Sequence, residues 1–335
     1  MRKLLLVVIC IATVKAVQEN FLLHAQPTLR RMVNFDPSMD ASMLRKAMKG
    51  LGTDEASIIN ILANRPNDQR QKISSAFKHA YGKDLVKELK SELSGKFERV
   101  VLAMMLPTTE LLADHLHEAM KGVGTNEDTL VEILCTRNNS EIIELKSVYE
   151  RKHGKPLQKS IESETSGHFS RLLVSMTTGA RDEANTNLQL APQLAQQLYT
   201  AGEGKVGTDE AEFNRILSYY SYPLLRAVFD EYKKIKGKSL IDAIKSEFSG
   251  DIQNGLIAVV SSIENRPQFF AKCLHDAMKG KDDALIRLIV TRAEIDLGTI
   301  KQEYQKLYGK SLESHIKSDT PDGDYKKMLI ALVDG

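Results

Sequence analysis

The stretch "GKDLVKELKSE" at residues 82–92 recurs three more times in this chain of 335 residues. Each copy has a Gly-Lys pair, then Leu, then Leu or Ile four residues later, and ends on Ser and an acid. The other copies lie at 154–164, 237–247 and 309–319, so the spacings are 72, 83 and 72 residues. A pattern that returns at such intervals indicates four structural repeats of about 70 residues.

A second motif, a glycine-rich turn that contains Gly-Thr, keeps the same intervals. It appears as "AMKGLGTDEAS" at 47–57, "AMKGVGTNEDT" at 119–129 and "GEGKVGTDEAE" at 202–212. Two separate motifs that shift together indicate true repeats, and about eleven extra residues fall between the second and third copies. The polar stretch "TTGARDEANTNLQLAP" at 177–192 accounts for them and indicates a linker.

Within each repeat, apolar residues are spaced three and four apart, which predicts five short helices and no strands. In the first repeat, Thr53 and Asn67 are candidates to cap the second and third helices with their side-chain oxygens. Gly82 is expected to end the third helix, and Gly95 to separate the fourth from the fifth. The predicted boundaries are 34–105, 106–177, 193–261 and 262–335 for repeats 1 to 4, with a linker at 178–192.

The N-terminus differs from the rest of the chain. Arg2 and Lys3 precede the apolar run "LLLVVICIATV" at 4–14, and small residues follow. This order is typical of a secretory signal, so we expect residues 1–16 to be a signal peptide and 17–33 an N-terminal tail. The alternative is a hydrophobic tail that stays attached and docks on the body or on a partner.

The bulk composition excludes some classes of protein. Hydrophobic residues make up 42% of the chain and charged residues 27%, which is ordinary for a globular protein with a core. The formal net charge is only +2, so no basic field favours nucleic acid as a partner. The histidines form no HExxH motif and no serine elbow is present, so we expect no enzyme.

The Gly-Thr turns keep a constant distance to an acid. In each complete copy, 38 residues separate the threonine from the Glu that ends the first motif. A simple helix joint has no need of such a carboxylate, whereas Ca²⁺ takes six to eight oxygens from carbonyls and carboxylates. No phosphate-binding GxxxxGK[ST] loop and no EF-hand loop is present, so calcium is the preferred ligand. The three pairs are Thr53 with Glu92, Thr125 with Glu164, and Thr208 with Glu247.

Together, the Lys-Gly-x-Gly-Thr turn, the acid 38 residues on and the fourfold repeat resemble the annexins. The resemblance covers Pro27 to Gly335. It implies an all-α fold in which four repeats of five short helices form one compact curved disc. It also implies Ca²⁺ as cofactor and calcium-dependent binding to membranes that bear acidic phospholipids such as phosphatidylserine.

The resemblance also implies which residues hold the calcium ions. Backbone carbonyls of each turn would act together with the distant acid. The residues implied are Met48, Gly50, Gly52 and Glu92 in repeat 1, Met120, Gly122, Gly124 and Glu164 in repeat 2, and Gly202, Lys205, Gly207 and Glu247 in repeat 3.

The fourth repeat departs from this pattern. Its turn, "AMKGKDDALIRL" at 277–288, is three residues shorter than the others and lacks Gly-Thr. Met278, Gly280 and Asp319 remain at the equivalent places, and we expect a weak or absent site there.

Residues at the tips of the turns are expected to touch the membrane. Lysines beside the ions would meet anionic headgroups, at about 1 kcal/mol each near the surface. Apolar residues would meet the headgroup and upper acyl region. The expected contacts are Lys49, Leu51, Lys121, Val123 and Val206.

Two functions remain open at this stage. One is the calcium-dependent membrane-binding protein, reversible and peripheral, monomeric in solution and able to assemble laterally on the membrane. The other is a calcium-independent helical scaffold for protein partners, one of which would bind through the N-terminal tail. Location depends on the leader: extracellular if the signal is used, and otherwise cytoplasmic and peripheral at membranes.

Overall fold

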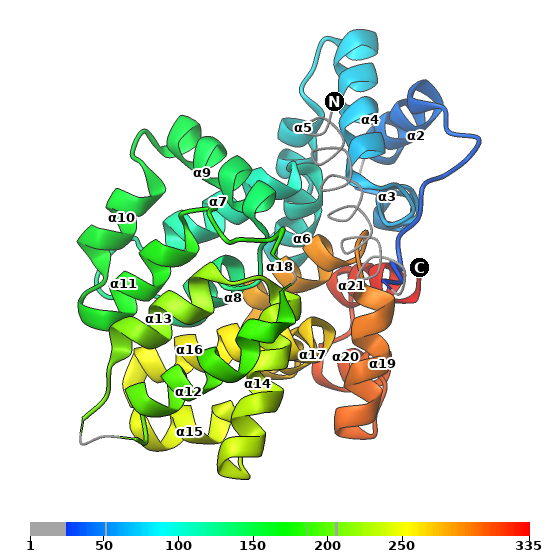
Figure 1. The fold of residues 1–335 in the computed structure, drawn as a ribbon. Helices are drawn as coiled ribbons and strands as arrows, with labels where there is room; N and C mark the ends of the chain where they lie inside the picture. Colours follow the sequence, from blue (N-terminus) through cyan, green and yellow to red (C-terminus); the bar gives the residue numbers. More distant parts are fainter. Residues whose placement is uncertain (1–24, 51, 186, 205–206) are drawn as a thin grey trace, which may run out of the picture. The chain divides into compact units, whose positions relative to one another are not determined.

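A computed structural model describes residues 25–50, 52–185, 187–204 and 207–335 (Figure 1). The predicted signal peptide and the first part of the tail lie outside the described residues. Within them the chain is all-α, as predicted, and carries no strand apart from one isolated bridge between Asp182 and Tyr220. None of the described helices is long and apolar enough to span a membrane.

Each repeat has the five helices predicted for it. Repeat 1 holds α2 (Pro37–Ala47), α3 (Glu55–Leu62), α4 (Asn67–Tyr81), α5 (Leu85–Glu92) and α6 (Gly95–Met105). Repeat 2 holds α7 (Thr108–Ala119), α8 (Glu127–Leu134), α9 (Asn139–His153), α10 (Leu157–Glu164) and α11 (Gly167–Met176). Repeat 3 holds the short 3₁₀ helix η1 (Leu188–Leu190), α12 (Ala191–Ala201), α13 (Glu210–Tyr219), α14 (Tyr222–Lys236), α15 (Leu240–Glu247) and α16 (Gly250–Glu264). Repeat 4 holds α17 (Arg266–Ala277), α18 (Asp282–Arg292), α19 (Leu297–Tyr308), α20 (Leu312–Asp319) and α21 (Asp324–Asp334).

The chain divides into two compact units. One comprises 112–269, which is most of repeats 2 and 3, and the other comprises 25–111 and 270–335, which is most of repeats 1 and 4. The pairing of the first repeat with the last means that contacts far apart in sequence hold the second unit together.

The helix ends in repeat 1 partly follow the sequence prediction. Gly82 ends α4 with a φ of 66°, in the left-handed region that glycine adopts freely. The predicted caps were wrong. Asp54 rather than Thr53 caps α3, accepting from the backbone N–H of Ser57, because it stands one residue nearer the helix. Asn67 is the first residue of α4, and its amide instead donates to carbonyl oxygens at the end of α6 and just beyond it.

In every repeat, one side chain of the first helix and one of the third helix form a ring-stacking or cation–π contact. The first member lies two residues before the end of the first helix, and the second lies at or near the end of the third helix. Such stacked contacts favour one relative placement of the two helices. The pairs are Arg45 over Tyr81, His117 on His153, Lys236 over Tyr199, and His275 on Tyr308.

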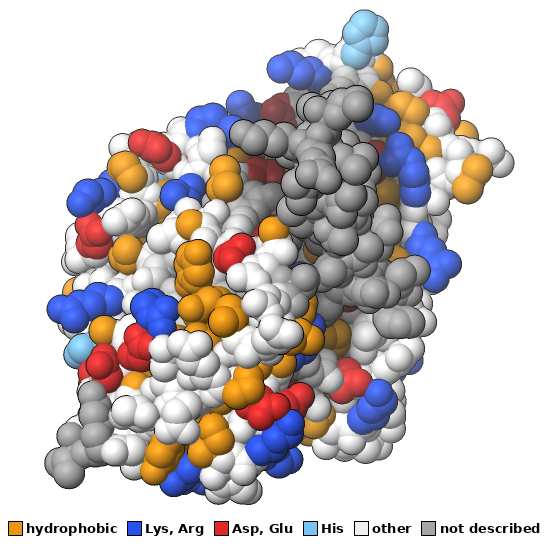
Figure 2. All heavy atoms as spheres, viewed as in Figure 1, with side chains coloured by type: hydrophobic (Ala, Val, Ile, Leu, Met, Phe, Trp, Pro, Cys, Tyr) orange, Lys and Arg blue, Asp and Glu red, His pale blue; other side chains and the backbone are white. Residues whose placement is uncertain are grey.

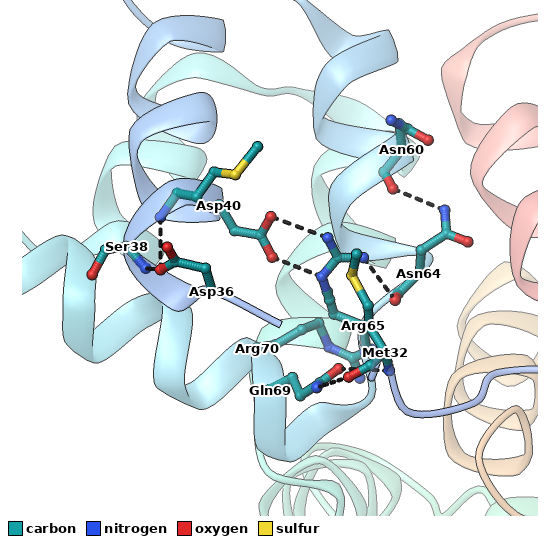
Figure 3. Close-up of polar contacts among 10 residues, drawn as sticks. Met32, Asp36, Ser38, Asp40, Asn60, Asn64, Arg65, Gln69 and Arg70 are labelled. Carbon is teal, nitrogen blue, oxygen red and sulfur yellow. Dashed lines mark hydrogen bonds and ion pairs between the residues drawn. The ribbon is translucent and has the colours of Figure 1, made fainter. Parts of the chain in front are cut away.

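A buried arginine joins repeats 1 and 4 in the second unit. Arg70 is only 1% exposed, and it donates to the carbonyl oxygen of Met104 at 2.8 Å and to that of Arg65. Its guanidinium also pairs with Glu294 at 3.1 Å. Figure 3 shows Arg70 beside Arg65, whose own guanidinium forms two bonds to Asp40, at 2.7 and 3.1 Å. This network satisfies buried polar groups that would otherwise cost free energy.

We predict that Arg70→Met destabilises the protein by about 3 kcal/mol, because it leaves the carbonyls of Met104 and Arg65 without this donor and removes the cation that pairs with Glu294. Urea unfolding followed by circular dichroism measures the loss. The matched control is Arg31→Met, which removes an exposed ion pair with Asp68 and should cost less than about 1 kcal/mol. Equal costs for the two variants would show that Arg70 does not hold the unit together.

Candidate metal centre

A backbone hydrogen bond closes the turn between the first two helices of each repeat. In repeats 1 to 3 the residue that caps the second helix donates its N–H to the carbonyl of the alanine that ends the first helix. The residues between these two form loops 48–53, 120–125 and 202–208 (loops 1 to 3). The bonds are Asp54 N to Ala47 O at 2.9 Å, Asn126 N to Ala119 O at 2.8 Å, and Asp209 N to Ala201 O at 2.7 Å.

The fourth turn closes differently. The N–H of Lys281 donates to the carbonyl of Ala277 at 2.9 Å, so only residues 278–280 (loop 4) lie between them. Lys281 begins α18 without a side-chain cap, whereas Asp54, Asn126 and Asp209 cap their helices. The shortening predicted from the sequence is therefore present in the backbone.

Loops 1 and 2 each contain two glycines in the left-handed region. Gly50 and Gly52 have φ of 124° and 85°, and Gly122 and Gly124 have φ of 97° and 82°. An added Cβ would meet no atom within 4 Å at any of these positions, so glycine is needed for its conformation and not for space. These turns leave backbone carbonyls without helix partners, which is the donor type that Ca²⁺ prefers.

Loop 1 meets its distant acid. Thr53 Oγ1 donates to Glu92 Oε2 at 3.3 Å, and Glu92 is the exposed last residue of α5. The side chain of Met48 is buried, at 5% exposure, so only its backbone carbonyl is available to an ion. Carbonyl donors of loop 1 and the carboxylate of Glu92 thus come from two segments that the fold brings side by side.

Loop 3 meets its acid in a similar way. Thr208 Oγ1 lies 3.5 Å from Glu247 Oε2 and 3.4 Å from the carbonyl oxygen of Glu247. A Cβ on Gly202 would lie 3.6 Å from Glu247 Cγ, so the start of the loop also faces this acid. Gly207 has a φ of 84°. Lys205, predicted as a ligand, lies outside the described residues.

Loop 2 is arranged differently at its threonine. Thr125 donates to Glu127 in α8, and Glu164 accepts from Ser163 at 3.2 Å. Burial raises the pKa of Tyr149, and the negative charge of Glu164 adds to that rise, so this acid lies near Tyr149. Glu247 has the same relation to Tyr232 in repeat 3, where burial is again the main cause of the raised pKa. Glu164 and Glu247 therefore lie near the equivalent tyrosines of their repeats, whereas the contact with the loop threonine is found for Glu247 and Thr125 instead donates to Glu127.

In repeat 4, the carboxylate of Asp319 lies beside the ring of a histidine. His315 Nε2 lies 3.5 Å from Asp319 Oδ2, and Gly280, with a φ of 87°, is the one glycine of loop 4. Met278 is buried, at 8% exposure. Loop 4 thus offers fewer free carbonyls than loops 1 to 3, and its acid has a competing partner.

The predicted membrane contacts that can be described are exposed. Lys49 and Lys121 are both at the surface, and Lys121 forms an exposed ion pair with Glu118 at 3.2 Å. Val123 is fully exposed at the tip of loop 2, unusual for a large apolar side chain. Leu51 and Val206 lie outside the described residues.

The donor set fits calcium. Among the described residues, no three His, Cys, Asp or Glu side chains gather as a metal site, so a cation held by side chains alone is not supported there. A single carboxylate with several carbonyls is a hard, all-oxygen set that leaves room for water or a ligand oxygen. Glu92, Glu164 and Glu247 with their loops would supply it.

One residue of this region was missed in the sequence. Glu203 lies in loop 3, accepts a hydrogen bond from Tyr232 and pairs with Lys238. The available signal was an acid at a position where the other two glycine turns carry Lys49 and Lys121.

The annexin family model matches four segments of the chain, at residues 39–104, 112–176, 193–259 and 269–332. The chain belongs to the annexin family. Annexin A7 of Homo sapiens is 51% identical over 312 residues, which cover 92% of this chain and 64% of that protein. This annexin therefore spans less than two thirds of the length of that relative.

Two solved structures show the same fold. A structure of annexin III is 44% identical, with a TM-score of 0.90 over 92% of this chain and 97% of the other. A structure of calcium-bound annexin (Sm)1 is 36% identical, with a TM-score of 0.84 over 93% of this chain and 94% of the other. The family is known for calcium-dependent phospholipid binding, and its members are generally non-enzymatic. They are mostly cytoplasmic and membrane-associated, so they lend no support to the predicted signal peptide, which stays a prediction.

We predict that Gly124→Ala destabilises the calcium-free protein by about 1 kcal/mol, because a Cβ disfavours its positive φ. Thermal unfolding in chelator measures the effect. Lys121→Ala, an exposed change in the same loop, serves as the control and should leave the midpoint unchanged within error. A Gly124→Ala protein as stable as the control would mean that the loop does not require the left-handed conformation.

Proposed function

We propose that this annexin binds acidic phospholipid membranes reversibly in the presence of calcium, through loops 1 to 3. Carbonyl oxygens of each loop and one distant carboxylate would hold each ion. The contact between the loop threonine and the distant acid in repeats 1 and 3 supports this proposal most directly, because the loop and the acid lie side by side there. The proposed ligands are Met48, Gly50, Gly52 and Glu92, then Met120, Gly122, Gly124 and Glu164, then Gly202, Gly207 and Glu247, with Lys205 from the sequence alone.

The donor set explains why the membrane is needed. One carboxylate per ion is a low charge count, so calcium binding in free solution should be weak. A lipid phosphate that fills an open coordination position raises the affinity for calcium, and calcium raises the affinity for lipid by the same factor. Several weak sites on one protein then act together, and the response to calcium becomes steep.

The chain's own side chains would assist at the surface. Lys49 and Lys121 supply positive charge beside loops 1 and 2, and Val123 supplies an apolar tip. On the face that Figure 2 shows, basic and acidic side chains of the described residues are interspersed.

The second candidate is a calcium-independent scaffold that binds proteins. The exposed apolar side chains Met32, Val33 and Met39, near the N-terminal tail, favour some contact with a partner. This role needs neither the left-handed glycines nor the acids in register with them, and so it explains less of the structure. A monomer in solution that assembles laterally on the membrane is part of the main proposal, as is a cytoplasmic or, if the leader is used, extracellular location.

Sedimentation with phosphatidylserine vesicles tests the proposal. The protein should pellet with calcium and stay in solution with chelator or with phosphatidylcholine vesicles. Pelleting that is the same with and without chelator, or no pelleting at saturating calcium, would favour the calcium-independent scaffold instead.

Substitution of the acids tests the ligands. Glu92→Gln with Glu164→Gln should raise the calcium needed for half-maximal pelleting by at least about tenfold, because the number of charged ligands sets calcium affinity. Asp319→Asn in repeat 4 is the matched control and should change it little, since loop 4 is short and His315 already holds Asp319. The opposite order of effects would show that the ions lie elsewhere.

A further inference from the structure

Loop 3 differs from loops 1 and 2 in having a carboxylate tied to the body of its repeat. Glu203 Oε2 accepts from Tyr232 Oη at 3.0 Å, and Glu203 Oε1 pairs with Lys238 Nζ. The Glu203 side chain is only 12% exposed. Loops 1 and 2 carry the exposed lysines Lys49 and Lys121 as their second residue, where loop 3 carries Glu203.

The two partners of Glu203 lie at the end of α14 and just after it. Tyr232 lies in the last part of α14 and is fully buried. Lys238 comes directly after Gly237, whose φ of 71° ends that helix. Glu203 is therefore an anchor that is held at both carboxylate oxygens, and it is not itself available to a cation.

The anchor lies beside the proposed third cation site. Gly202, the residue before Glu203, faces Glu247, and Thr208 at the far end of loop 3 contacts the same acid. Loop 3 spans 202–208, one residue more than loops 1 and 2. A longer loop has more conformational entropy to lose on binding an ion, and an anchor near its start reduces that loss before the ion arrives.

We propose that Glu203 is a positioning residue for the third calcium site. Its bonds to Tyr232 and Lys238 hold the start of loop 3, residues 202–204, beside Glu247, so that less of this longer loop has to be ordered when the cation binds. The proposal rests on the proposed function and adds a dependence that loops 1 and 2 do not share, since neither has an acid at this place.

The repeats supply the matched variants. Phe77 occupies in repeat 1 the place that Tyr232 occupies in repeat 3, five residues before the glycine that ends the helix, and it is equally buried. Tyr232→Phe therefore removes one hydrogen bond to Glu203 with a side chain that the fold already accepts there. Glu203→Gln keeps an amide oxygen that can accept from Tyr232 or Lys238, whereas Glu203→Ala removes the anchor.

The experiment isolates the third site in the full chain that carries Glu92→Gln and Glu164→Gln. Calcium chloride is titrated by calorimetry and by pelleting with phosphatidylserine vesicles. Glu203→Ala should weaken calcium binding by about tenfold, the lower end of the range for groups that orient metal ligands. Tyr232→Phe should weaken it less, and Glu203→Gln should restore most of the loss. Glu118→Ala, which removes an exposed acid from repeat 2, controls for net charge and should have no effect.

The outcomes separate the two proposals. If the background protein does not respond to calcium, or if Glu247→Gln in that background changes nothing, the third site itself is wrong and the anchor with it. If Glu247→Gln abolishes the response and Glu203→Ala and Tyr232→Phe leave it unchanged, the anchor alone is overturned. Equal losses for Glu203→Ala and Glu203→Gln would also overturn it, because they would show an effect of charge and not of position.

Discussion

The hydrogen bond that closes the first turn of each repeat is the constraint on which the proposed sites depend. Where Asp54, Asn126 or Asp209 donates the closing N–H, the loop between the two helix ends has at least six residues and can turn several backbone carbonyls towards one point. Where Lys281 donates it, the loop has only three residues, 278–280. A cation site made of backbone carbonyls needs the longer loop, so this single bond separates repeats 1 to 3 from repeat 4.

The second half of each site depends on the core. Glu92, Glu164 and Glu247 each end a short helix whose leucines and isoleucines are buried, so packing fixes where the carboxylate emerges. The cost of ordering loop and acid is therefore largely met by folding and not by ion binding. In the proposed function, calcium and lipid would then add only the last contacts, which suits a reversible membrane interaction.

Much of this was accessible from the sequence, for physical reasons that differ by feature. Helical periodicity is present in all four copies, and the same separation of threonine and acid is present in three of them, so repeat number, helix content and the shortened fourth loop could be predicted. The cap of α3 could not, because Thr53 and Asp54 are both good caps and only backbone geometry decides between them. Glu203 was missed because its partners, Tyr232 and Lys238, lie far along the chain and no local pattern links them. The hydrogen bond from Thr125 to Glu127 instead of Glu164 could not be predicted either, because side-chain rotamers decide which of the two acids accepts it.

A crystal structure at saturating calcium, with the ions located by their anomalous scattering, tests the central claim most directly. The account predicts an ion in each of loops 1 to 3, bound by loop carbonyl oxygens and by Glu92, Glu164 or Glu247, and none in loop 4. Ions bound away from these carboxylates, or an ion in loop 4 with loops 1 to 3 empty, would contradict it.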